Sequence, residues 1–197
     1  YTLVKTEERE FDYPGAAGDV YTEYDGAGGI PISGFFHKLA FAWRERTIKF
    51  FTTSAIDGDS RVIIRNNIVD RVATVAPFLT LDGDPYMVIA DKRLFWIQDA
   101  YTTTDRYPYA TPDGDLNYIR NSVKVVIDAY NGTMHFYVFD DQDPLLRTYR
   151  TVFPDLFTPV DEIPDELFAH VRYPEGQFMT QARIFETYHV SSPDVLY

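Results

Sequence analysis

The sequence contains no cysteine. This absence excludes disulfide bonds, thiolate nucleophiles and thiolate metal sites together. The four histidines, His37, His135, His170 and His189, lie far apart and form no His-x-x-x-His or His-Glu-x-x-His pattern. A Gly-x-Ser-x-Gly nucleophile elbow and a phosphate loop are also missing. The sequence therefore indicates no catalytic residue, and a binding role is favoured over an enzymatic one.

Long apolar runs and an excess of positive charge are missing as well. No window approaches 18 consecutive apolar residues, so no segment is expected to span a membrane or insert directly into lipid. The formal charge is −12. Binding to nucleic acid needs clustered Lys and Arg residues, and anionic lipid headgroups repel an acidic protein. We therefore expect neither nucleic acid nor a lipid surface as a partner.

Aromatic side chains are abundant, with 15 Phe and 15 Tyr in 197 residues. Such a composition usually indicates a thick core, and it can also provide stacking surfaces for sugars or other partners. The length fits one domain. We predict a single α+β domain over residues 1–197.

Residue patterns divide this domain into helical and extended parts. Residues 1–34 are predicted to be an extended loop, because the Gly/Pro/Asp-rich stretch 11–34 cannot hold a regular helix. Residues 35–77 are predicted to be helical, with Ser33 as the N-cap and three helices at 35–43, 48–56 and 61–76. The first of these shows apolar residues at helical spacing, namely Phe35, Phe36, Leu39, Ala40, Ala42 and Trp43.

The middle of the chain changes to a β pattern. Residues 86–139 are predicted to form an antiparallel four-stranded meander, flanked by helices before and after. Its turns are Asp91-Lys92 and Asn131-Gly132, and the second is a strong type I′ hairpin signal. Residues 144–190 are predicted to be helical, opening with Asp143 as a cap and Pro144 at the first helical position. The predicted strands are 86–90, 93–101, 123–130 and 133–139, and the later helices are 145–152, 165–171 and 175–188.

Asp-Gly-Asp triplets stand out as a pattern with a possible metal function. Asp57 with Asp59, and Asp82 with Asp84, place two carboxylates one residue apart in a turn, where they could converge on calcium. Asp and Gly are also what turns and helix caps require without any metal, and that interpretation is favoured. No other cofactor is expected.

A polar, tyrosine-rich region follows the second predicted strand. Tyrosines interleaved with Asp, Arg and Asn can line a wet pocket for a sugar or another polar ligand. The same side chains can instead hold long connections in place by hydrogen bonds. The candidate ligand-binding residues are Asp99, Tyr101, Tyr107, Tyr109, Tyr118 and Arg120.

Several stretches of the sequence resemble uncharacterised protein family 0182. The longest is the stretch of residues 117–132, NYIRNSVKVVIDAYNG, and the likeness extends over nearly the whole chain. The sequence departs from the family pattern at Gly34 and His37. The other runs that carry the resemblance are 12–14, 20–22, 71–79, 99–103, 107–109 and 167–173.

The resemblance implies a setting rather than a mechanism. Members of the family look like large bacterial membrane proteins, with several transmembrane helices followed by a long region outside the lipid. The chain begins without an initiator Met and ends abruptly, which predicts a segment of a longer protein. We expect an extracytoplasmic, soluble domain at the cell membrane, whose partner is its own transmembrane region. It would serve ligand binding, assembly or transport.

The alternative hypothesis is a hydrolase that acts on a cell-envelope polymer. Such chemistry needs two carboxyl groups about 5–9.5 Å apart across a cleft. The candidate carboxylates are Asp99, Asp105, Asp128 and Asp140.

Overall fold

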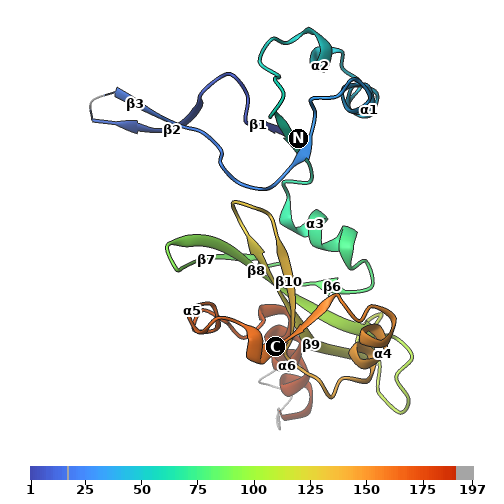
Figure 1. Ribbon diagram of the computed structural model, residues 1–197. Coiled ribbons are helices and arrows are strands. Elements are labelled where there is room, and N and C mark those ends of the chain that lie inside the picture. The colour runs from blue at the N-terminus through green and yellow to red at the C-terminus, as the bar shows by residue number, and fades with distance from the viewer. Residues whose placement is uncertain (17, 190–197) are drawn as a thin grey trace. The chain divides into compact units, whose positions relative to one another are not determined.

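Short strands occupy much of the segment that was expected to be an extended loop. The computed structural model describes residues 1–16 and 18–189, and it divides into two compact units, Tyr1–Asn67 and Ile68–Tyr197 (Figure 1). Whether the chain is a single domain stays a prediction. The strands of the first segment are β1 (Thr2–Val4), β2 (Glu10–Gly15), β3 (Gly18–Thr22) and β4 (Ile30–Pro31).

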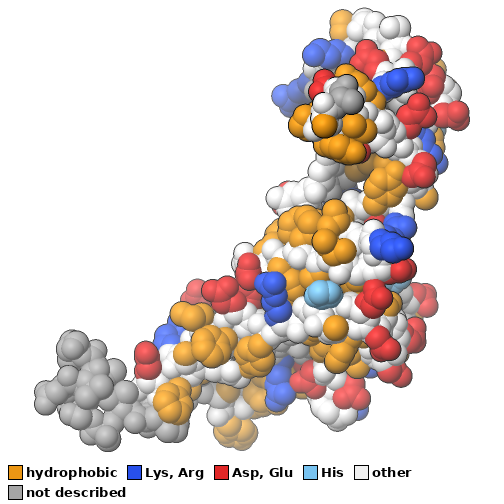
Figure 2. Space-filling model, turned by 90° about the vertical axis from the view of Figure 1, so that its left-hand side faces the viewer, with side chains coloured by type: hydrophobic (Ala, Val, Ile, Leu, Met, Phe, Trp, Pro, Cys, Tyr) orange, Lys and Arg blue, Asp and Glu red, His pale blue; other side chains and the backbone are white. Residues whose placement is uncertain are grey.

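The loop prediction for residues 1–34 is therefore wrong in part, because pairing partners lie far away in sequence. Strands β1 and β4 both pair with β5 (Arg61–Ile63), while β2 and β3 form a hairpin. Gly29, in a left-handed conformation (φ 87°), lets β4 approach β5, since a Cβ there would lie 3.1 Å from the Arg61 Cβ. Phe11, Tyr13 and Tyr21 of this hairpin are exposed, and Figure 2 shows hydrophobic side chains gathered on the surface of the first unit, in the upper part of the view.

The helical prediction for residues 35–77 is correct at both ends and wrong between them. Helix α1 (Phe35–Glu45) begins after Gly34 rather than after a Ser33 cap, and α2 (Lys49–Thr52) is short. The predicted helix 61–76 is instead β5 followed by α3 (Ile68–Val75). Arg65 has a φ of 54°, a left-handed conformation that an α-helix cannot contain.

The core of the first unit uses few of the residues that define the helical pattern of α1. Phe41 is buried, whereas the apolar residues on the other side of the helix are exposed. The rings of Phe41 and Phe50 lie 5.9 Å apart and join α1 to α2. The buried cluster of this unit consists of Ile32, Phe41, Phe50, Ile56 and Val62.

A six-stranded mixed sheet organises the second unit. The four predicted strands are neighbours in it and pair antiparallel in sequence order, so the chain is a mixed α+β protein. The four-stranded prediction is incomplete, because β6 pairs with β8 and β11 pairs parallel with β10. The strands are β6 (Thr80–Leu81), β7 (Tyr86–Ala90), β8 (Arg93–Thr104), β9 (Tyr118–Asp128), β10 (Met134–Val138) and β11 (Phe157–Pro159).

The two predicted turns of this sheet behave differently. Asp91 and Lys92 join β7 to β8 with φ values of 47° and 61°, as a type I′ turn requires. The expected two-residue turn at Asn131-Gly132 is wrong, because a longer connection joins β9 to β10. The Asp128 carboxylate accepts hydrogen bonds from the backbone N–H groups of Tyr130 and Asn131 and so organises this loop.

Helices cover both faces of the sheet. One apolar cluster joins α3 and α4 to strands β8, β9 and β10, and another joins α5 and the preceding turn to the opposite face. The prediction that residues 144–190 are helical is wrong at β11, and its last residue lies outside the described residues. None of the described helices is long and apolar enough to cross a membrane. The helices are α4 (Pro144–Val152), the 3₁₀ turn η1 (Val160–Glu162), α5 (Asp165–Phe168) and α6 (Glu175–His189).

Candidate functional site

A cavity of about 180 Å³ lies in the second unit, between the connection that precedes β9 and helix α6. Four of its nine lining residues are aliphatic or aromatic, and threonine hydroxyls, an amide and one ion pair add polar groups. We call it the Tyr118 cavity. It is lined by Thr111, Asp113, Leu116, Asn117, Tyr118, Ile119, Thr180, Arg183 and Ile184.

One wall of the Tyr118 cavity is a loop held by the side chain of Asn117. The Asn117 amide accepts from the Tyr107 N–H and donates to the Tyr107 carbonyl, both at 2.8 Å. The Tyr107 ring then stacks on the Tyr118 ring, with centroids 4.5 Å apart and planes at 16°. A side-chain amide that pairs with a backbone in this way fixes the loop as a strand neighbour would.

Asp143 holds the same wall in place through a hydrogen bond with Tyr118. Its carboxylate is buried and accepts hydrogen bonds from the hydroxyls of Thr102, Ser122 and Tyr118, and from the Leu145 N–H as the N-cap of α4. Burial alone would raise the pKa of Asp143, but the hydrogen bonds from Ser122, Thr102 and Tyr118 outweigh it and hold this pKa below its ordinary value. The carboxylate thus stays charged and positions Tyr118.

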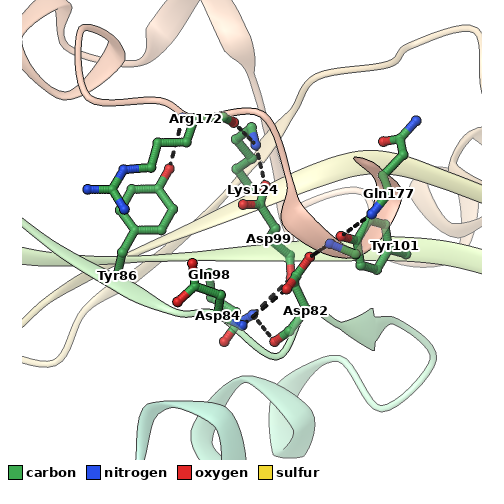
Figure 3. Close-up of polar contacts among 10 residues, drawn as sticks. Asp82, Asp84, Tyr86, Gln98, Asp99, Tyr101, Lys124, Arg172 and Gln177 are labelled. Atoms are coloured by element: carbon green, nitrogen blue, oxygen red, sulfur yellow. Dashed lines mark hydrogen bonds and ion pairs between the residues drawn. The ribbon is translucent and has the colours of Figure 1, made fainter. Parts of the chain in front are cut away.

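The other wall is helix α6, which Asp82 ties to the sheet. The Asp82 carboxylate accepts from the Tyr101 hydroxyl of β8 and, at 3.0 Å, from the Gly176 N–H at the start of α6 (Figure 3). The Gln177 N–H donates to the Tyr101 oxygen at 3.3 Å. A Cβ at Gly176 would lie 3.1 Å from the Asp82 Oδ2 and from the Tyr101 hydroxyl oxygen, so any larger residue would crowd this contact.

A buried ion pair lies beside this tie. Asp99 of β8 and Lys124 of β9 face each other across the strands, and each side chain is only 4% exposed. Burial raises the pKa of Asp99, and the bond from Lys124 opposes this shift without cancelling it. Lys124 also donates to the Arg172 carbonyl at 3.0 Å, so the pair fixes the segment that leads into α6 (Figure 3).

The structure separates the six predicted ligand-binding residues into three groups of two. Asp99 and Tyr101 are buried in the contacts that hold α6 and are closed to a ligand. Only Tyr118 lines the cavity, with Tyr107 stacked behind it.

The two remaining candidates lie outside this arrangement. Tyr109 is fully exposed, and Arg120 pairs with Asp140 at 3.0 Å. Most lining residues were missed in the sequence. Among them, Leu116, Thr180 and Ile184 carried no local signal, because the fold brings them together across more than 60 positions.

The predicted metal residues act as turn residues. Asp57 accepts hydrogen bonds from the N–H groups of Asp59 and Ser60, and Asp82 accepts from the N–H of Asp84. Among the described residues, no group of three or more His, Asp or Glu side chains is arranged to hold a metal ion. The calcium hypothesis therefore gains no support from this geometry.

The carboxylates of the hydrolase hypothesis are all engaged in ion pairs. Each of the four is paired with a different cation, and none of them lines the Tyr118 cavity. This argues against the paired-carboxylate mechanism. The pairs are Asp99 with Lys124, Asp105 with Arg106, Asp128 with Arg93, and Asp140 with Arg120.

Comparison with known proteins returns one family and many relatives. A family model described as "Uncharacterised protein family (UPF0182)" matches residues 1–197. The "UPF0182 protein bll7333" of Bradyrhizobium diazoefficiens is 49% identical over all of this chain, which covers 22% of that relative. A UPF0182 protein of Alkaliphilus metalliredigens is 46% identical, with 21% of its length covered. No solved structure matches the chain.

Proposed function

Because this chain belongs to the uncharacterised protein family UPF0182 and spans about 22% of the length of the relatives it matches, we propose that it is a ligand-binding module of a larger membrane protein. The observation that carries the proposal is the Tyr118 cavity. Its two walls are each held by dedicated polar contacts, those of Asn117 and Asp143 on one side and that of Asp82 on the other. Walls held in this way keep a binding site preformed, which lowers the entropic cost of binding.

The lining of the cavity favours a sugar ring as the ligand. A volume of about 180 Å³ is below the range of about 300–1,000 Å³ that drug-sized ligands occupy, so the ligand is small. Apolar side chains such as Leu116 and Ile184 suit the C–H face of a sugar, and aromatic residues such as Tyr118 often line such sites. Thr111 and Thr180 bring hydroxyls to the same walls for polar contacts. We infer a monosaccharide unit, free or at the end of a longer glycan.

Filling the cavity is expected to abolish binding. Ile184→Trp places a large ring in the cavity, while Ile89→Trp adds the same ring at an exposed position on β7 and serves as the matched control. A sugar that binds the parent chain and Ile89→Trp at a hundred times its Kd should stabilise each by about 2.7 kcal/mol and leave Ile184→Trp unchanged. Thermal shift with a panel of monosaccharides measures this. The proposal would be contradicted if no sugar of the panel shifted the NMR resonances of residues 111–119. Equal binding by Ile184→Trp and the parent chain would also contradict it.

The membrane setting has a separate test. We propose that this module lies outside the cytoplasm, on the strength of the family resemblance and of a cysteine-free composition. In the full-length protein of intact cells, Tyr109→Cys is expected to react with a membrane-impermeant maleimide, because Tyr109 is fully exposed. The full-length protein without this substitution gives the background. Labelling that appears only after the cells are opened would place the module in the cytoplasm.

A further inference from the structure

Helix α1 presents an apolar arc on the outside of the first unit. With 3.6 residues per turn, the five residues of this arc fall within about 140° of the helix circumference. Trp43 is 86% exposed and Phe36 is 81% exposed, values far above those of core aromatic residues. The arc consists of Phe35, Phe36, Leu39, Ala40 and Trp43.

The apolar surface continues onto helix α2. The rings of Phe35 and Phe51 lie 5.7 Å apart, as do those of Phe35 and Phe36, so three rings form one contiguous group. Ile48, before α2, is 74% exposed. We call the surface formed by Phe35, Phe36, Leu39, Trp43, Ile48 and Phe51 the aromatic patch.

The aromatic patch contributes little to the core of its own unit. Phe41 points to the opposite side of α1 and packs on Phe50, and these two residues bury the interface between α1 and α2. A large contiguous apolar surface that the core does not use indicates an interaction site.

The charge around the aromatic patch is opposite in sign to that of the chain. Residues 35–52 contain four Lys or Arg and one Glu, a formal charge of +3, whereas the chain carries −12. On the helix circumference, Arg44 follows one edge of the arc and Lys38 the other. Long basic side chains at the edges of an apolar face can extend toward headgroups while their stems cover apolar surface.

We propose that α1 and α2 dock the first unit on a bilayer that contains anionic lipid. An apolar face with Trp and Phe, bordered by Lys and Arg, is the pattern of a helix that lies in the membrane interface. The local charge complements the headgroups, and the acidic remainder of the chain is repelled, so only this face turns toward the lipid. This proposal departs from the expectation, based on the net charge of −12, that no lipid surface is a partner, because it takes into account where the charge lies.

Vesicle binding of the chain 1–197 tests the proposal. Trp43 and Trp96 are the two tryptophans, so a Trp96→Phe variant reports on Trp43 alone. With vesicles of phosphatidylcholine and phosphatidylglycerol, the Trp43 emission is expected to shift to the blue and to be quenched by brominated lipid chains. Binding is expected to be about tenfold weaker with vesicles of phosphatidylcholine alone, and also about tenfold weaker with the anionic vesicles at high salt.

Two sets of variants separate the apolar from the charged contribution. Phe36→Ser with Leu39→Ser should weaken binding about tenfold or more, because both side chains would enter the lipid. Arg44→Glu with Lys49→Glu should weaken binding to anionic vesicles alone, whereas Arg106→Glu with Arg147→Glu, exposed in the second unit, should not. Absence of binding to anionic vesicles would overturn the proposal. So would self-association in solution that Phe36→Ser abolishes, because it would assign the patch to a second copy of the chain.

Discussion

Lys124→Met is expected to destabilise the second unit by about 3–5 kcal/mol, because it leaves the Asp99 carboxylate buried without its cation. The methionine side chain fills a similar volume, so a lost charge rather than a cavity would cause the loss. Lys92→Met is the matched control, since Lys92 is exposed in the turn between β7 and β8. Urea denaturation in a Trp43→Phe background measures the effect, because Trp96 of β8 then reports on the second unit alone.

The double variant separates a specific pair from a general packing defect. Asp99→Asn with Lys124→Met removes both charges, and its loss should be clearly smaller than the sum of the two single losses. If the Lys124→Met chain does not fold, folding of the double variant still tests the pair, because removing the second charge should then restore folding. Single variants within about 0.5 kcal/mol of the parent chain would show that the pair is not buried as described.

Asp143→Ala is expected to cost about 3–5 kcal/mol, because four donors lose one acceptor group. The loss combines an N-cap, worth about 1 kcal/mol, with the burial of hydroxyls that no longer have a partner. Asp141→Ala, at an exposed position two residues earlier, should be nearly neutral. Urea denaturation measures both variants. If the two gave equal losses, the network around Asp143 would have no particular weight.

The dependence of stability on pH gives the same prediction a second measurement. The pKa of Asp143 in the folded chain lies below its ordinary value of 3.8. The contribution of this group to stability is therefore complete above the unfolded pKa and is lost as the pH falls through the folded pKa. As the pH is lowered from 5 to below the folded pKa of Asp143, the free energy of unfolding of Asp143→Ala should therefore decrease less than that of the parent chain. Asp82 and Asp128 have lowered pKa values as well, so some acid sensitivity should persist.

Loss of Asp143 should also loosen the Tyr118 cavity, because this carboxylate positions the Tyr118 hydroxyl. A sugar that binds the parent chain should therefore bind Asp143→Ala more weakly, at a temperature where the variant is still folded. This tests the proposed function separately from stability, since binding is compared while the variant is folded, and Asp141→Ala, whose side chain does not line the cavity, should bind the sugar as the parent chain does.

Where a signal is local, the sequence predicted the structure well. Asp143 and Pro144 begin α4 as expected, because a cap and a proline at the first helical position act within one turn. The turn at Asp91-Lys92 is correct for the same reason. Asn131-Gly132 failed although its signal is stronger, because the Asp128 side chain offered the backbone a competing set of hydrogen bonds.

By itself, the sequence determined the mixed α+β class, the four central strands and the family, since these depend on periodicity, turn residues and long matching runs. Only the tertiary structure decided which polar residues form buried contacts between segments and which line a cavity. Asp99 and Tyr101 look like ligand-binding residues in the sequence. In the fold, contacts with neighbouring strands and the close approach of Gly176 make them part of the structure that holds α6. Burial and contact across distant segments are properties of the packed chain, and no local pattern specifies them.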